Sequence, residues 1–265
     1  MTCSLAASCT FHGPAWSVDG SGIDTASQSI GDAATCAAPI VIDDRFDNGD
    51  LETAGPLSMG TGFAPVTNAS TGNGSSVELP GAALKISTSN NTPPQAPAQG
   101  AVSNTSFSFD PAGMTVRLEV TASDTPIWNG IALALQSNQA NIDGVGGSLV
   151  LRIRGQGTNP FNVDMGNQAT YATPLGLQPY DEAALADGFV VTWKLDASSW
   201  SYIVDGLRAN GTSVVDSGSF RVGETPANLL GATVHLGIHI QGNPNDANPR
   251  VLRVNRMTLW DGICP

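Results

Sequence analysis

Acidic side chains crowd one short stretch of the chain, VIDDRFDNGDLE at residues 41–52. The acids in it are Asp43, Asp44, Asp47, Asp50 and Glu52. Carboxylates at this density can work as a catalytic pair, bind a hard cation, or lie solvated at the end of a strand. A retaining glycosidase needs two carboxylates about 5 Å apart. Among the five glutamates only Glu52 has an acid two residues away, Asp50, and this pair lies beside a turn, so glycoside hydrolysis is not favoured.

A second set of candidate binding or catalytic residues lies on segments in which apolar and polar side chains alternate. In MTVRLEV, GSLVLRIRG and ATVHLGIHIQG, the polar side chains that face away from the apolar ones include Arg117, Arg152, Arg154, His235, His239 and Gln241. Such groups can bind a saccharide, or neutralise a uronate carboxylate and move protons during polysaccharide β-elimination. The ordinary alternative is a mixed polar face of an antiparallel sheet in contact with water.

Aromatic side chains could also hold a sugar by stacking. Trp128, which precedes Asn129-Gly130, and Trp16 are the candidates expected to be exposed. Trp200 and Tyr202 lie two residues apart on one face of a predicted hairpin. We expect that face to be buried, because aromatic side chains on a hairpin tend to pack together in the core.

Motifs and charge exclude several functions. The sequence has no Gly-x-Ser-x-Gly, no His-Glu-x-x-His and no phosphate-binding glycine loop that ends in Lys-Ser or Lys-Thr. Its net charge is −12 and its only lysines are Lys85 and Lys194, so it has no basic stripe for nucleic acid or an anionic membrane. No apolar run approaches the ~18 residues that cross a bilayer. We expect no catalysis, no nucleic-acid partner and no membrane insertion.

Four cysteines stand at the two ends of the chain: Cys3, Cys9, Cys36 and Cys264. They include no Cys-x-x-Cys pair typical of a zinc knuckle. Three pairings are possible, and we expect Cys36 with Cys264 and Cys3 with Cys9, because strands at the two ends of a sandwich are commonly neighbours. Closing the long loop would stabilise the fold by about 4–5 kcal/mol. Disulfides would indicate an oxidising compartment, and four reduced cysteines are the alternative.

Strand periodicity predicts the fold. From residue 39 onward, period-two runs recur between clusters of Gly, Pro and Asn, as in antiparallel strands with one buried face. About a dozen such runs favour an all-β, two-sheet antiparallel sandwich over residues 39–265. The stretch DEAALADG (181–188) is expected to form one helical turn. Residues 1–38 show no periodicity and are predicted to be an irregular, cysteine-bearing N-terminal extension.

Three segments carry a family resemblance: RFDNGDLETAGPLSMGTGF, the hairpin GFVVTWKLDASSWSYIVDG, and VLRVNRMTLWDG. Over about residues 40–262 they resemble the laminin-G-like, concanavalin A-like jelly rolls of bacterial cell-surface and secreted proteins. The resemblance implies a jelly roll of two antiparallel sheets whose first and last strands are adjacent. Such sandwiches host lectins, adhesins, glycanases, lyases and passive structural modules, so the fold alone implies no single function.

The resemblance also implies a structural Ca²⁺ near the ends of the first and last strands. The candidate ligands are Asp47, Asp50, Glu52 and Asp261. Calcium takes six to eight oxygen ligands, but the stretch lacks the spacing of a twelve-residue calcium loop. Acids solvated at a strand end are therefore the alternative.

These observations predict a non-catalytic extracellular structural or adhesive module. It would be a self-assembling subunit of a surface filament, layer or virion shell, in which the N-terminal extension joins neighbouring copies. The first alternative is a carbohydrate-binding, lectin-like module with a polysaccharide partner, and the second is a polysaccharide lyase or glycoside hydrolase. The opening residues lack the basic start and apolar core of a secretory signal. We therefore expect a mature secreted chain, or release by another route such as lysis.

Overall fold

The structure is a computed structural model, and it describes residues 36–46, 63–67, 76–78, 83–87, 98–110, 112–123, 130–136, 149–156, 159–167, 176–220, 230–241 and 251–265. The chain divides into two units after residue 35, and all of the described residues belong to the unit Cys36–Pro265. Most of the predicted extension, with Cys3, Cys9 and Trp16, therefore lies outside the described residues.

Strands make up nearly all of the regular structure. They are β1 (Ile40–Asp44), β2 (Phe63–Thr67), β3 (Ser76–Glu78), β4 (Leu84–Ser87), β5 (Ala98–Ser103), β6 (Phe107–Ser108), β7 (Met114–Ser123), β8 (Gly130–Gln136), β9 (Leu149–Gln156), β10 (Asn159–Asn167), β11 (Gly176–Pro179), β12 (Phe189–Leu195), β13 (Ser199–Asp205), β14 (Val214–Ser219), β15 (Thr233–Gln241) and β16 (Val251–Trp260). The 3-10 helix η2 (Glu182–Asp187) lies where the sequence predicts one helical turn. The all-β prediction is confirmed.

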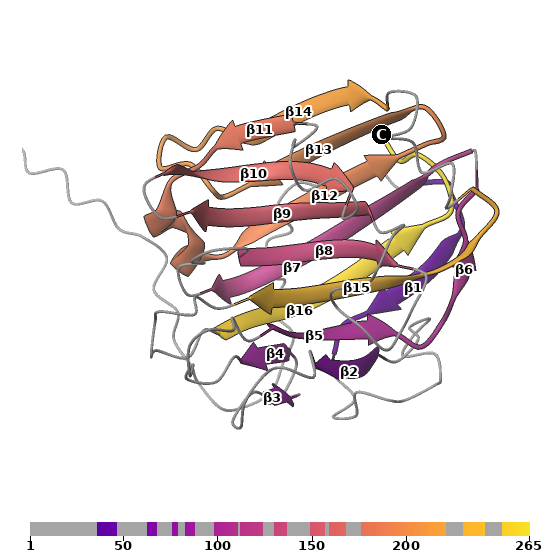
Figure 1. Ribbon diagram of the computed structural model, residues 1–265, viewed down its shortest axis with the longest axis horizontal. Helices are drawn as coiled ribbons and strands as arrows, with labels where there is room; N and C mark the ends of the chain where they lie inside the picture. Colours follow the sequence, from indigo (N-terminus) through magenta and orange to yellow (C-terminus); the bar gives the residue numbers. More distant parts are fainter. Residues whose placement is uncertain are drawn as a thin grey trace, which may run out of the picture. The chain divides into compact units, whose positions relative to one another are not determined.

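The strands pair into two antiparallel sheets, which overlap in the view of Figure 1. The first, here called the β7 sheet, has the order β14-β13-β12-β7-β16-β4-β3, and β1 also pairs with β16. The second, the β8 sheet, has the order β11-β10-β9-β8-β15-β5-β2, and β6 also pairs with β15. The two sheets form the predicted sandwich.

The core lies between the sheets because every second side chain of a strand points there. Along β12 the burial alternates residue by residue, and Phe189, Val191, Trp193 and Leu195 are the buried positions. Trp200 and Tyr202 are buried as well, and their rings stack with centroids 6.1 Å apart. The predicted burial of the aromatic hairpin face is therefore confirmed.

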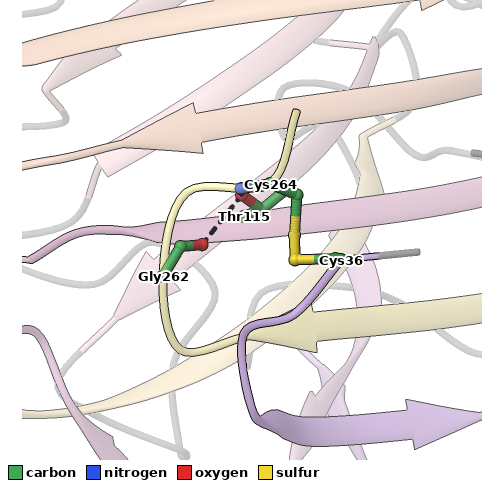
Figure 2. Close-up of a disulfide and its surroundings, with 4 residues drawn as sticks. All are labelled: Cys36, Thr115, Gly262 and Cys264. Carbon is green, nitrogen blue, oxygen red and sulfur yellow. Dashed lines mark hydrogen bonds between the residues drawn. A yellow bond between two sulfur atoms is a disulfide. The ribbon is translucent and has the colours of Figure 1, made fainter. Parts of the chain in front are cut away.

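The two ends of the described unit are joined. β1 pairs with β16, with Ile42 opposite Leu259, as the family resemblance implied. Cys36 and Cys264 form a disulfide across a sequence separation of 228 (Figure 2). The C-terminal segment crosses Thr115 of β7, whose hydroxyl donates to the Gly262 carbonyl at 2.9 Å and accepts from the Cys264 N–H at 2.8 Å. Thr115 is thereby buried, although its outward strand position predicted exposure.

Candidate functional site

Five of the predicted ligand-binding residues belong to strands of the β8 sheet. Arg152 and Arg154 come from β9, and His235, His239 and Gln241 come from β15. The residues that alternate with the first four are buried in the core: Leu151, Ile153, Leu236, Ile238 and Ile240. Arg152, Arg154, His235 and His239 therefore share the outer face of the β8 sheet, away from the β7 sheet.

Strand register sets the spacing of the polar groups on this face. Arg152 lies opposite Ala132 of β8, and Ala132 lies opposite His239. With neighbouring strands about 4.8 Å apart, the backbones at Arg152 and His239 are separated by about 10 Å, with a single methyl group between them. One step along β8, Ala134 lies between Val150 and Gly237. The central strand thus gives the face a floor of very small side chains.

Glycines make room for the polar side chains on the neighbouring strands. A Cβ atom placed on Gly237 would lie 3.1 Å from Oε1 of Gln136, and one on Gly166 would lie 3.4 Å from Nη2 of Arg152. Long polar side chains therefore extend over the glycines of the next strand. Sequence reasoning missed Gln136 and the alanine floor, although the alternation Ala132-x-Ala134-x-Gln136 in GIALALQ marks both.

The burial of this face differs from the solvated face that the sequence predicts. Arg152 is 3% exposed and Val150 is 2% exposed. Ala132, Ala134 and Val150 form a small hydrophobic cluster of their own, separate from the main core. Alternation places these residues outside the sandwich, yet they are as buried as residues of the core. The expectation of a wet surface is therefore wrong at these positions.

His239 is held in the neutral form at ordinary pH. Burial of the ring, followed by the nearby charge of Arg152, lowers the pKa of His239 to about 4. Its Nε2 atom is buried and has no hydrogen-bond partner among the described residues. On the same strand, Nδ1 of His235 lies 2.8 Å from the carbonyl oxygen of Ser103. A neutral imidazole can donate with one nitrogen and accept with the other, which suits hydroxyl ligands.

Arg117, which the sequence groups with these five residues as a candidate ligand contact, does not join this face. It belongs to β7 and therefore lies on the outer face of the opposite sheet. There its Nε atom donates to Oε1 of Glu119 at 3.1 Å, and both side chains remain partly exposed. Alternation places a residue on a face of its own sheet, but it does not say which sheet the strand joins.

Two acids of the VIDDRFDNGDLE stretch have structural roles. Asp43 binds the Arg256 guanidinium with both carboxylate oxygens, at 2.7 and 2.9 Å. Asp44 accepts the backbone N–H of Phe46 at 2.8 Å, which supports the positive φ of Phe46. Asp47, Asp50 and Glu52 lie outside the described residues.

Asp261 is the one candidate calcium ligand that the structure describes. Its backbone N–H donates to the Pro39 carbonyl at 2.8 Å, and its side chain lines a hollow of about 140 Å³ together with Asp110. Within the described ranges, no three His, Cys, Asp or Glu side chains come close enough to hold a metal ion. The other three candidate ligands, Asp47, Asp50 and Glu52, lie outside the described residues, so the calcium site stays a prediction.

The remaining aromatic candidates lie either in the core or outside the described residues. Trp128 lies outside the described residues, two positions before β8 begins at Gly130. Tyr202 and Tyr180, the tyrosines that the structure describes, belong to the main core. Neither is an acid-base partner on the face that carries Arg152 and His239. No helix within the described residues is long and apolar enough to span a membrane.

The fold defined by these two sheets is that of the legume lectins and their structural relatives. Lectin I-B4 from Griffonia simplicifolia, in a metal-free form, matches with a TM-score of 0.52 and 12% identity over 74% of this chain and 92% of its own. Arcelin-5, a lectin-like defense protein from Phaseolus vulgaris, matches with a TM-score of 0.56 and 10% identity over 82% and 96%. The exoplasmic/lumenal domain of VIP36, in a Ca²⁺/Man2-bound form, matches with a TM-score of 0.56 and 10% identity over 82% and 87%.

These likenesses concern the fold. They confirm the concanavalin A-like jelly roll that the family resemblance implied, and the laminin-G-like and bacterial parts of that resemblance stay predictions. No protein-family model and no curated protein matches the sequence.

Proposed function

We propose that the chain is a non-catalytic, extracellular carbohydrate-binding module whose ligand contacts the outer face of the β8 sheet. The observation that carries the proposal is the gathering of Arg152, Arg154, His235 and His239 on that face, around the alanines of β8. The lectin fold supports it, because several of its structural neighbours are lectins. The Cys36–Cys264 disulfide supports an oxidising location.

The residue types suit a sugar. A neutral His239, an arginine fork and the amide of Gln136 offer both donors and acceptors at fixed positions, as polyhydroxylated ligands require. Arg154 and His235 are only half-buried, so they are the groups through which a glycan would reach this face. Trp128, two residues before β8, is proposed as the stacking platform.

Two other predictions concern regions outside the described residues. Self-association through the N-terminal extension, in a filament, layer or virion shell, remains a prediction that sizing of the full chain would test. Calcium at Asp47, Asp50, Glu52 and Asp261 also remains a prediction. A calcium-bound relative is known in VIP36, and the corresponding test here is a rise in melting temperature when Ca²⁺ is added to chelator-treated protein.

A glycan array probed with the full chain tests the carbohydrate-binding proposal. We expect retention on a subset of glycans, and we expect Trp128→Ala and Arg154→Ala each to reduce it about tenfold. Arg117→Ala is the matched control, because it removes a partly buried arginine from the opposite sheet and should bind normally. Wild-type protein that binds no glycan, or equal losses in the Arg154 and Arg117 variants, would reject the proposal.

A further inference from the structure

The β7 sheet carries a groove on its outer side, at the end formed by β12, β13 and β14. Two adjoining hollows of about 340 and 440 Å³ make up the groove, and both are lined by Lys194, Ser201 and Ser217. These three residues lie opposite one another in the strand register, so they form one row across the three strands. The groove is on the opposite sheet from the face that carries Arg152 and His239.

The C-terminal segment forms one wall of this groove. Ile263 lines the first hollow and is 47% exposed. The segment is fixed on both sides of Ile263, because Gly262 accepts the Thr115 hydroxyl and Cys264 is bonded to Cys36 (Figure 2). The other wall is the edge strand β14, with Ser217 and Ser219. The groove is therefore built on rigid elements.

Lys194 is the cation at the centre of the groove. Among the residues that the structure describes, it has no ion-pair or hydrogen-bond partner. Two acids, Asp196 and Asp216, line the hollows, but neither is a partner of Lys194. Asp196 accepts hydrogen bonds from the backbone and hydroxyl groups of Ser198 and Ser199. A Cβ atom placed on Gly176 of β11 would lie 2.5 Å from Oδ2 of Asp216, so that carboxylate is directed to the edge of the other sheet.

We propose that this groove binds an acidic saccharide, with a uronate carboxylate on Lys194 and sugar hydroxyls on Ser201 and Ser217. A carboxylate on an ammonium group forms the stronger, charge-assisted type of hydrogen bond. Serine hydroxyls donate and accept, which complements a ring that carries several hydroxyls. Because two hollows share the Lys194 row, the groove has room for consecutive sugar units of one chain.

A saccharide fits the groove better than an acidic peptide. A peptide would bind an open strand edge through its backbone and would need pockets for alternate side chains. The groove instead lies over the paired backbones of β12 and β13, and its lining includes the hydroxyl side chains of Thr192, Ser199, Ser201, Ser217 and Ser219. The site is independent of the β8 sheet, so either binding proposal can fail without the other.

Lysine acetylation of the full 265-residue chain tests the proposal, because the chain contains only Lys194 and Lys85. Short oligogalacturonate at saturating concentration should slow acetylation of Lys194 about fivefold and leave Lys85 on β4 unchanged, as read by peptide mass spectrometry. The methyl-esterified oligomer, which keeps the hydroxyls but lacks the charge, should protect Lys194 little. Equal protection by both oligomers, no protection at Lys194, or protection by an oligoglutamate alone would each overturn the assignment.

Calorimetry gives a second, independent measurement. Lys194→Met should weaken oligogalacturonate binding about fivefold to tenfold, the loss of one partly exposed charge-assisted contact. Lys194→Arg should restore most of the affinity, and Lys85→Met should bind like the wild type. Unchanged affinity in Lys194→Met would contradict the proposal.

Discussion

The outer faces of the two sheets come from the same alternating pattern, but they differ in burial. On the β7 sheet, Arg117 is half-exposed and forms an ion pair with Glu119, and Lys194 lies in an open groove. On the β8 sheet, Arg152 is 3% exposed, and Ala134 beside it on the same face is fully buried. Two outward-facing arginines that look alike in the sequence thus lie at a partly exposed surface in one sheet and in a buried environment in the other.

The central strands of the two sheets differ as well. Thr115, Arg117 and Glu119 of β7 present polar side chains outward, whereas Ala132 and Ala134 of β8 present single methyl groups. A methyl floor allows close packing and removes water, so the polar groups around it must satisfy one another or a ligand. The outward side chains of the two central strands thus differ in size and in polarity, and Thr115 of β7 is buried only because the C-terminal segment crosses it.

Removing one arginine from each face should give the largest contrast. Arg152→Ala should lower the free energy of unfolding by about 3–4 kcal/mol, because it leaves a cavity and deprives buried polar groups of their partner. Arg117→Ala should lower it by less than about 1 kcal/mol, because a partly exposed ion pair contributes little. Urea unfolding followed by tryptophan fluorescence measures both. Similar losses in the two variants would mean that the faces do not differ as described.

The main features of the fold were predictable from the sequence because strand alternation is a local signal. The inward positions of β7, β9, β12 and β15 all follow from period-two runs. The pairing of β1 with β16 followed from the family resemblance. The assignment of strands to sheets was not predictable in the same way, because it depends on contacts between segments far apart in the chain. For this reason Arg117 was grouped with side chains of the opposite sheet.

Parts of the candidate site could not be predicted from short stretches of sequence, because they also depend on contacts between distant segments. Thr115 is buried by the C-terminal segment, and the hydrogen-bonded Gly262 is 147 residues away in the sequence. Gly100 and Gly237 are required by the side chains of neighbouring strands, His239 for Gly100 and Gln136 for Gly237, which leave little room for a Cβ atom. The groove around Lys194 needs the register of three strands and the position of Ile263. None of these relations appears in a window of adjacent residues.

Adding one methyl group to the floor of the buried face should be the next largest effect. A Cβ atom on Gly100 would lie 2.5 Å from both the Cβ atom of His239 and the carbonyl oxygen of Ile238. Because one of these is a backbone atom, the strand must shift, and Gly100→Ala should cost about 3 kcal/mol. Ser217→Ala on the exposed face is the control, within about 0.5 kcal/mol of the wild type. A neutral Gly100→Ala variant would show that the β5–β15 contact is loose.

Acidification should distinguish the two faces through His239. Its folded-state pKa of about 4 lies below the ordinary value of 6.5, so the unfolded chain binds more protons between these values. The stability from the neutral imidazole is complete above pH 6.5 and is lost as the pH falls toward 4. From pH 7 to pH 5 the wild type should lose on the order of 2 kcal/mol more than His239→Gln. A pH profile unchanged in His239→Gln would contradict this account.

The ion pair at the edge of the β7 sheet should give the smallest of these effects. Asp43 binds Arg256 with two oxygens, and this hydrogen bonding, aided by the charge of Asp43, raises the pKa of Arg256 despite partial burial. Because Arg256 keeps about a third of its side-chain exposure, water and salt screen the pair. A double-mutant cycle with Asp43→Asn and Arg256→Met should give a coupling free energy of about 1 kcal/mol that shrinks in 1 M salt. A coupling free energy that is larger and insensitive to salt would mean that water is excluded from this part of the β7 sheet, as it is around Arg152. The contrast between the two sheets would then be confined to their central strands.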